Sequence, residues 1–130
     1  YDTGNLVIAA SVDPSRAEGT IRAIIVELGQ LCETLVPDDE LERIKAYIRG
    51  GILLGLEGTQ QVASWLGSQE CLRNQVREID EILAQVDAVT PQDIQRVAQA
   101  CFSPEWRRLS IIGPDDPARA QYLGTLLTGV

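Results

Sequence analysis

The segment Val36–Gly67, VPDDELERIKAYIRGGILLGLEGTQQVASWLG, constrains the fold most, because it reads as two consecutive amphipathic helices. Pro37 followed by three acids is typical of a helix N-terminus, with Asp38 as the expected cap. Thr59 begins the second helix, which continues to about Leu72. Apolar residues recur at helical spacing along the first helix and predict its buried face: Leu41, Ile44, Ile48 and Ile52.

The remainder of the first helix combines a charged face with unexpected glycines. Gly50 and Gly51 lie in mid-helix, where each glycine is less favourable than alanine by about 1 kcal/mol, and Gly55 continues this small-residue edge. These glycines match no phosphate-binding pattern, so we predict that another backbone packs closely against them. The side chains expected to face away from the core are Glu42, Arg43, Lys45 and Arg49.

Four further helices are indicated by start signals and apolar spacing. Asp13 and Pro14 begin a helix that continues to about Thr34. Glu78–Asp87 is the next, and Thr90 with Pro91 begins another that ends near Phe102. The last is expected over Ala118–Leu127.

Two segments read as strands rather than helices. Asn5–Val12 is short, rich in β-branched residues and apolar on both faces, and Glu105–Gly113 is the second candidate. We therefore predict an α+β fold with about two strands and six helices, in which a layer of helices covers a sheet. Two strands form only a marginal sheet, so further strands are expected from outside this chain. Exposed sheet edges would also allow two copies to form a homodimer.

Composition limits the class of protein. At 130 residues the chain is expected to be a single domain over 1–130. A net charge of −8 argues against a nucleic-acid partner. No apolar run approaches the roughly 18 residues of a membrane span, and no signal peptide is evident, so a cytoplasmic location is expected. The chain also contains no methionine, which predicts a fragment of a longer protein.

The residues that usually carry chemistry are missing or isolated. There is no histidine, the commonest general base and metal ligand. Ser64 and Ser68 have no base to activate them, and the acids at 38–40 and 115–116 read as helix caps. We predict no catalytic, cofactor-binding or metal-ligating residue in this chain. Trp65 is expected in the core, Trp106 either there or at a partner contact, and the three cysteines are expected to be reduced and buried: Cys32, Cys71 and Cys101.

The order of local motifs resembles the non-catalytic, C-terminal-type domain of the pitrilysin/insulinase family of zinc metallopeptidases, which includes the mitochondrial processing peptidase. The resemblance covers nearly the whole chain, although no single motif is specific. The matching pieces are Asp2-Thr3-Gly4, Val36 with Asp39-Glu40-Leu41 and Lys45, Leu54–Glu57 with Ala63 and Leu66-Gly67, Val89–Ile94, and Ile111–Pro114.

The resemblance implies an α+β domain with a mostly antiparallel sheet, paired with a homologous catalytic domain around a chamber for unfolded peptides. That catalytic domain carries HxxEH and the zinc ion, and it lies in the same chain or in a partner subunit. No family site residue transfers to this chain, and Tyr1 is too close to Gly4 to be the substrate-binding tyrosine. The implied role is a chamber wall of a peptidase, and the alternative is an inactive subunit or scaffold without a proteolytic role.

Overall fold

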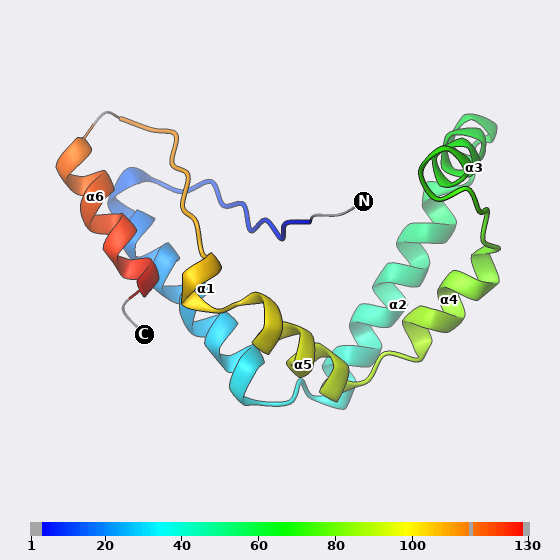
Figure 1. The fold of residues 1–130 in the computed structure, drawn as a ribbon, viewed down its shortest axis with the longest axis horizontal. Coiled ribbons are helices and arrows are strands. Elements are labelled where there is room, and N and C mark those ends of the chain that lie inside the picture. The colour runs from blue at the N-terminus through cyan, green and yellow to red at the C-terminus, as the bar shows by residue number, and fades with distance from the viewer. Residues whose placement is uncertain (1–3, 115, 129–130) are drawn as a thin grey trace. The chain divides into compact units, whose positions relative to one another are not determined.

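The computed structural model describes residues 4–114 and 116–128, and all regular structure in these ranges is helical (Figure 1). Tyr1, Asp2, Thr3 and Asp115, which entered the sequence interpretation, lie outside the described residues. The elements, in chain order, are η1 (Pro14–Arg16), α1 (Ala17–Glu33), α2 (Asp38–Gly55), α3 (Thr59–Arg73), α4 (Ile79–Asp87), α5 (Pro91–Cys101), η2 (Pro104–Trp106), α6 (Pro117–Thr125) and η3 (Leu126–Thr128).

The six predicted α-helices are confirmed, and their ends follow local chemistry. The Asp13 carboxylate accepts a hydrogen bond from the Ser15 N–H at 2.8 Å and begins η1, which leads into α1. Asp116 caps α6 by accepting from the Arg119 N–H at 3.1 Å. One cap differs from the prediction: Pro37 is the N-cap of α2, and Asp38 is already helical.

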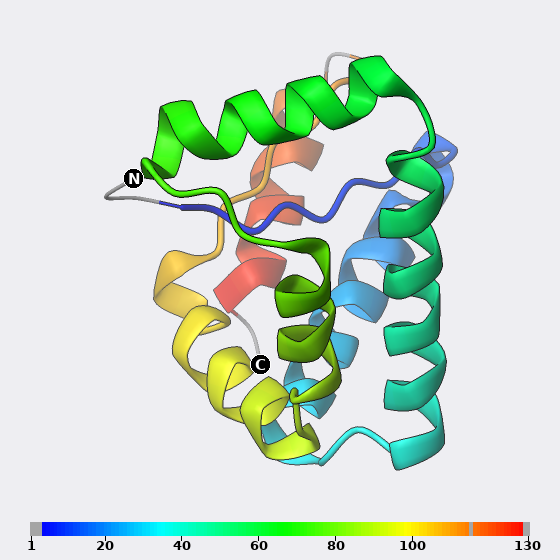
Figure 2. The ribbon, with the colours of Figure 1, turned by 90° about the vertical axis from the view of Figure 1, so that its right-hand side faces the viewer.

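The chain divides into two compact units. The first unit contains Val36–Pro91 together with the N-terminal residues as far as Asn5, and the second contains Leu6–Leu35 and Gln92–Val130. In the first unit α2 and α4 pack side by side (Figures 1 and 2), and each buries one leucine, Leu41 and Leu83. In the second unit α1, α6 and η3 surround a small core of Ile25, Leu123 and Leu126.

The predicted α+β fold is wrong for the residues that the structure describes, because these residues form no strand and no sheet. Residues 6–12 and 107–112 are irregular, and most of their apolar side chains are exposed: Val7 is 73% and Ile112 is 102% exposed, whereas Leu109 packs partly buried against the core of the second unit. The sequence pattern identified correctly that residues 5–12 and 107–113 are not helical, but Glu105 and Trp106, the start of the second predicted strand, lie in η2. A strand also requires a hydrogen-bonded partner, which a local pattern cannot reveal. Because the described residues form no sheet, the predicted homodimer through sheet edges has no structural basis in them.

The predicted faces of α2 also need correction. Lys45 donates from Nζ to the backbone oxygen of Asp87 at 2.9 Å, and the Arg49 guanidinium pairs with the Asp87 carboxylate. Both cations therefore contact α4: the Lys45 side chain is only 12% exposed and that of Arg49 is 44% exposed, whereas Ile44, predicted to be buried, is 45% exposed. The covered face is rotated toward the charged side of the helix, because long side chains such as lysine can bury their stems and still bond at their ends.

Close packing at the α2 glycines is not observed. A Cβ atom placed on Gly50, Gly51 or Gly55 would meet no heavy atom within 4 Å in the described structure. The cysteine prediction is also wrong in part, since all three thiols are free but Cys71 and Cys101 are exposed.

This open space gives a prediction for stability. Gly51→Ala is expected to raise the free energy of unfolding by about 0.5–1 kcal/mol, because alanine has the higher helix propensity and its methyl group meets nothing here. The reverse change at an exposed site of the same helix, Ala46→Gly, is the matched control and should lower stability by a similar amount. Urea unfolding followed by circular dichroism measures both, and destabilisation by Gly51→Ala would show that a backbone does pack against this position.

Candidate functional site

The resemblance implies a zinc ion, and the residues described here do not form a set of ligands that fits one. The sequence contains no histidine. Among the residues that the structure describes, no group of three or more His, Cys, Asp or Glu side chains could hold a metal ion. Asp38, Asp39 and Glu40 are exposed in the first turn of α2, and Asp116 is the cap of α6. These carboxylates stabilise helix starts, where the helix dipole favours negative charge.

The two serines considered as nucleophiles lie on α3. The Ser68 hydroxyl donates to the backbone oxygen of Trp65 at 2.9 Å, an internal helix contact rather than an activating one. Trp65 itself is half-buried, whereas Trp106 is 69% exposed, so Trp106 lies outside the core.

An open apolar groove lies in the second unit. It has a volume of about 720 Å³ and lies between residues 8–12 and one face of α1. Gly19 and Ala23 contribute little side-chain bulk on the α1 side of the groove, while Arg16 and Glu27 are its charged lining residues. The apolar side chains that line it are Ile8, Val12, Ile24, Leu28 and Leu31. Such a surface can hold another apolar segment, and its polar lining residues are Ser15, Arg16, Thr20 and Glu27.

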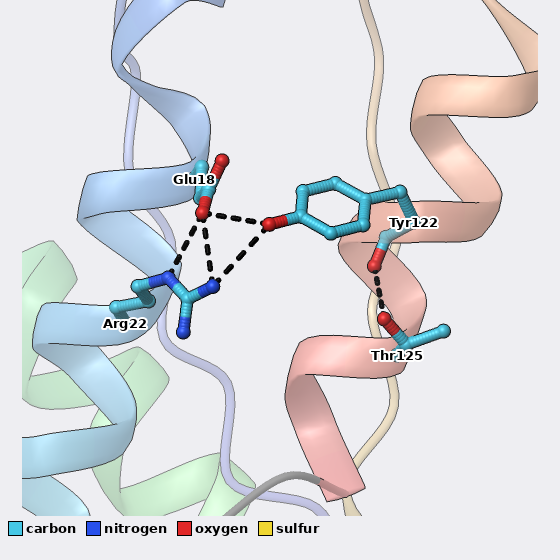
Figure 3. A network of polar contacts seen from close by, with 4 residues as sticks. All are labelled: Glu18, Arg22, Tyr122 and Thr125. Carbon is cyan, nitrogen blue, oxygen red and sulfur yellow. Dashed lines mark hydrogen bonds and ion pairs between the residues drawn. The ribbon is translucent and has the colours of Figure 1, made fainter.

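A polar network joins α1 to α6 across the second unit (Figure 3). The Tyr122 hydroxyl donates to Glu18 Oε1 at 2.9 Å, and Arg22 Nε donates to the same oxygen at 3.0 Å. Arg22 Nη2 also donates to the Tyr122 hydroxyl at 3.3 Å. The hydrogen bond from Tyr122, followed by that from Arg22, holds the pKa of Glu18 below its ordinary value. Spacing of four residues could suggest the Glu18–Arg22 pair, but no sequence signal identifies Tyr122 as its partner.

The pKa of Glu18 provides a test of this network. Tyr122→Phe is expected to move that pKa up toward the ordinary value of 4.5, because the strongest hydrogen bond to the carboxylate is lost. In the unmodified chain the lowered pKa stabilises the folded state above pH 4.5, and this contribution disappears as the pH falls through the folded-state pKa. Carboxyl ¹³C NMR titration measures the shift. The control is Tyr47→Phe, at a tyrosine that is 78% exposed on α2, and an equal effect of both variants would contradict the network.

The described helices include none that is long and apolar enough to cross a membrane. Exposed apolar residues occur in both units. On α2 they include Ile44, Tyr47, Ile48, Leu53 and Leu54.

Comparison with known proteins identifies relatives among zinc proteases. An uncharacterised zinc protease of Streptomyces coelicolor is 31% identical over 115 residues, which cover 87% of this chain and 24% of that protein. The mitochondrial-processing peptidase subunit beta of Lentinula edodes is 40% identical over 62 residues, or 48% of this chain and 13% of that protein. The bovine subunit beta is 26% identical over 113 residues, covering 87% of this chain and 23% of that protein.

No protein-family model matches the sequence. The chain spans about a quarter of the length of the curated relatives that match most of it. Zinc proteases of Mycobacterium leprae and Bacillus subtilis, both uncharacterised, match 87% of the chain at 28% and 26% identity. This likeness to zinc proteases extends over most of the chain and confirms the predicted resemblance to the pitrilysin/insulinase family of zinc metallopeptidases.

Proposed function

We propose that this chain is a non-catalytic part of a zinc-dependent peptidase, where it forms a wall of the chamber that takes up unfolded peptides. The zinc ion and the catalytic residues lie in a homologous catalytic domain, in the same polypeptide or in a partner subunit. One observation carries the proposal: a sequence similar to zinc proteases over 87% of its length contains no histidine. The HxxEH motif requires two histidines, so this segment cannot supply it.

The distribution of apolar side chains supports a packing role. The buried apolar core of the described residues consists of six side chains, Ile25, Leu41, Leu83, Ala98, Leu123 and Leu126. By contrast, Tyr47 is 78%, Leu54 is 69% and Trp106 is 69% exposed. Large exposed apolar surfaces mark sites of interaction, and aromatic residues are enriched where proteins meet. A wall that packs against a catalytic domain accounts for these surfaces.

The alternative is an inactive subunit or scaffold of the same family without a proteolytic role. Some relatives are named as a subunit of a peptidase and others as zinc proteases without a subunit, so the catalytic domain is sought both in the same polypeptide and in a partner subunit. The similarity does not by itself assign a role in cleavage.

The proposal is tested with the purified chain and with the HxxEH-bearing polypeptide of the same genome. The chain alone, incubated with zinc and desalted, should retain far less than one zinc per molecule and should not cleave a fluorogenic unfolded peptide. Coexpression should yield a complex that binds zinc and cleaves the peptide, whereas the catalytic polypeptide alone should be much less active. If the genome encodes this segment and the HxxEH-bearing segment in one polypeptide, the test compares that polypeptide with a variant from which this segment is deleted. The deletion variant should then be much less active.

Three results would distinguish the possibilities. Stoichiometric zinc or cleavage by the chain alone would overturn the proposal. A stable complex with unchanged cleavage would favour the scaffold. A matched control is the complex with HxxEH changed to HxxQH, which should keep binding the chain but lose cleavage, because the glutamate is the general base of this motif.

A further inference from the structure

An incompletely bonded arginine lies in the first unit between α3 and α4. The Arg77 backbone N–H donates to Gln69 Oε1 at 3.3 Å, and its Nη1 donates to Gln85 Oε1 at 2.8 Å. Arg77 Nε is buried and has no hydrogen-bond partner in the described structure. None of the ion pairs formed by the described residues includes Arg77. The guanidinium is therefore held by α4 on one edge, while its Nε edge remains unused.

Gln69 presents a second unused donor. It is 8% exposed and is the buried polar residue of the described part of the chain. Its Oε1 accepts from Arg77, but its Nε2 is buried without a partner. Buried donors are almost always bonded in folded proteins, because desolvation without a partner is unfavourable. Two residues that are hydrogen-bonded to each other thus each carry a buried donor that lacks an acceptor in the described structure.

The chemistry of the donors favours a carboxylate as the acceptor. The Nε and Nη2 atoms of a guanidinium form the edge that matches two carboxylate oxygens. The site also lies beside the start of α4, where the N-cap Glu78 makes no side-chain capping bond and backbone N–H groups favour negative charge. Three exposed acids, Glu78, Asp80 and Glu81, repel a multiply charged anion such as phosphate. The same acids repel a singly charged carboxylate less strongly than a doubly charged phosphate, because the repulsion scales with the charge of the anion.

We propose that Arg77 and Gln69 form a binding site for one carboxylate of a peptide or protein, supplied by an acidic side chain or by a chain end. The site is built entirely from α3, α4 and the segment between them, within the first unit. It does not depend on zinc, on catalysis or on the presence of a partner domain. Its test is therefore independent of the test of the proposed peptidase role.

The test uses ¹⁵N NMR of the full chain. The Nε–H of Arg77 and the side-chain amide of Gln69 are followed during titration with sodium acetate, with acetamide as the uncharged analogue and sodium chloride as the control for ionic strength. Saturable shifts of both groups with acetate, and no saturation with the other two, are the expected result. Two further ligands separate the sources: N-acetyl-aspartate amide presents a side-chain carboxylate, and N-acetyl-glycine presents a chain end.

Matched variants identify the residue responsible. Arg77→Lys keeps the positive charge but removes Nε–H, and it should weaken acetate binding at least tenfold while the amide spectrum stays that of a folded chain. Arg43→Lys makes the same change at an exposed position of α2 and should leave binding unaltered. Equal responses to acetate and acetamide, unchanged binding in Arg77→Lys, or a bound-water signal at both groups that acetate does not displace would overturn the proposal.

Discussion

Leu123→Ala is expected to lower the free energy of unfolding of the second unit by about 2–5 kcal/mol. Leu123 is 3% exposed and lies with Ile25 and Leu126, which are 4% and 8% exposed, in the core cluster of that unit. Truncation removes buried methyl groups and leaves a cavity that α1 and α6 can fill only in part. The effect is expected to be large because the core of this unit contains few other buried apolar side chains.

The matched control is Leu6→Ala, the same substitution in the same unit at a residue that is 65% exposed. It should change stability by no more than about 0.5 kcal/mol. Urea unfolding followed by circular dichroism, and by the emission of Trp106 in the second unit, measures both variants. Similar losses for Leu123→Ala and Leu6→Ala would show that Ile25, Leu123 and Leu126 do not form the core.

Arg107→Ala is expected to lower the free energy of unfolding by about 1.5–3 kcal/mol, the range for hydrogen bonds that involve a charged group. Arg107 Nε and Nη2 donate to the Phe102 backbone oxygen at 3.2 and 3.1 Å, and Nη1 donates to the Leu127 oxygen at 3.2 Å. One guanidinium thus bonds the residue that follows α5 and also η3, where unpaired carbonyl groups carry partial negative charge. Its removal leaves both carbonyl groups without this donor.

The neighbouring arginine provides the comparison. Arg108 is exposed, and its Nη1 donates to the Glu105 and Arg107 oxygens, both within three residues. Arg108→Ala should therefore cost no more than about 0.5 kcal/mol. Hydrogen exchange of the α5 and α6 amides complements urea unfolding, since Arg107→Ala should speed exchange in both helices. Equal effects of the two variants would mean that charge, rather than the contacts of Arg107, determines stability here.

Helix positions could be predicted from the sequence because their chemistry is local. A helical hydrogen bond joins residues four apart, and caps such as Asp13 and Asp116 act on backbone groups two or three residues away. The absence of the HxxEH motif can likewise be read from the sequence, because the chain contains no histidine. The family resemblance followed from the order of such local motifs, and the zinc-protease relatives confirm it.

Contacts between distant segments were not readable in the same way. The bonds from Tyr122 to Glu18, and from Gln95 and Gln99 to the Cys32 oxygen, span 104, 63 and 67 residues. Apolar spacing placed Ile44 inside and Lys45 outside, whereas α4 covers the side of α2 that carries Lys45. Several side-chain arrangements satisfy one pattern of polarity, and only the packed neighbour selects among them.

The segment Val36–Gly67 illustrates which features the local sequence determines and which depend on tertiary contacts. Its sequence by itself determined two helices and their approximate ends, because both depend on residues within a few positions. Only the tertiary structure decided that Lys45 and Arg49 face α4 and that Gly50, Gly51 and Gly55 border open space. It also decided that the apolar segments at 6–12 and 107–112 form no strand in the described chain, since strand pairing depends on a partner that no local pattern specifies.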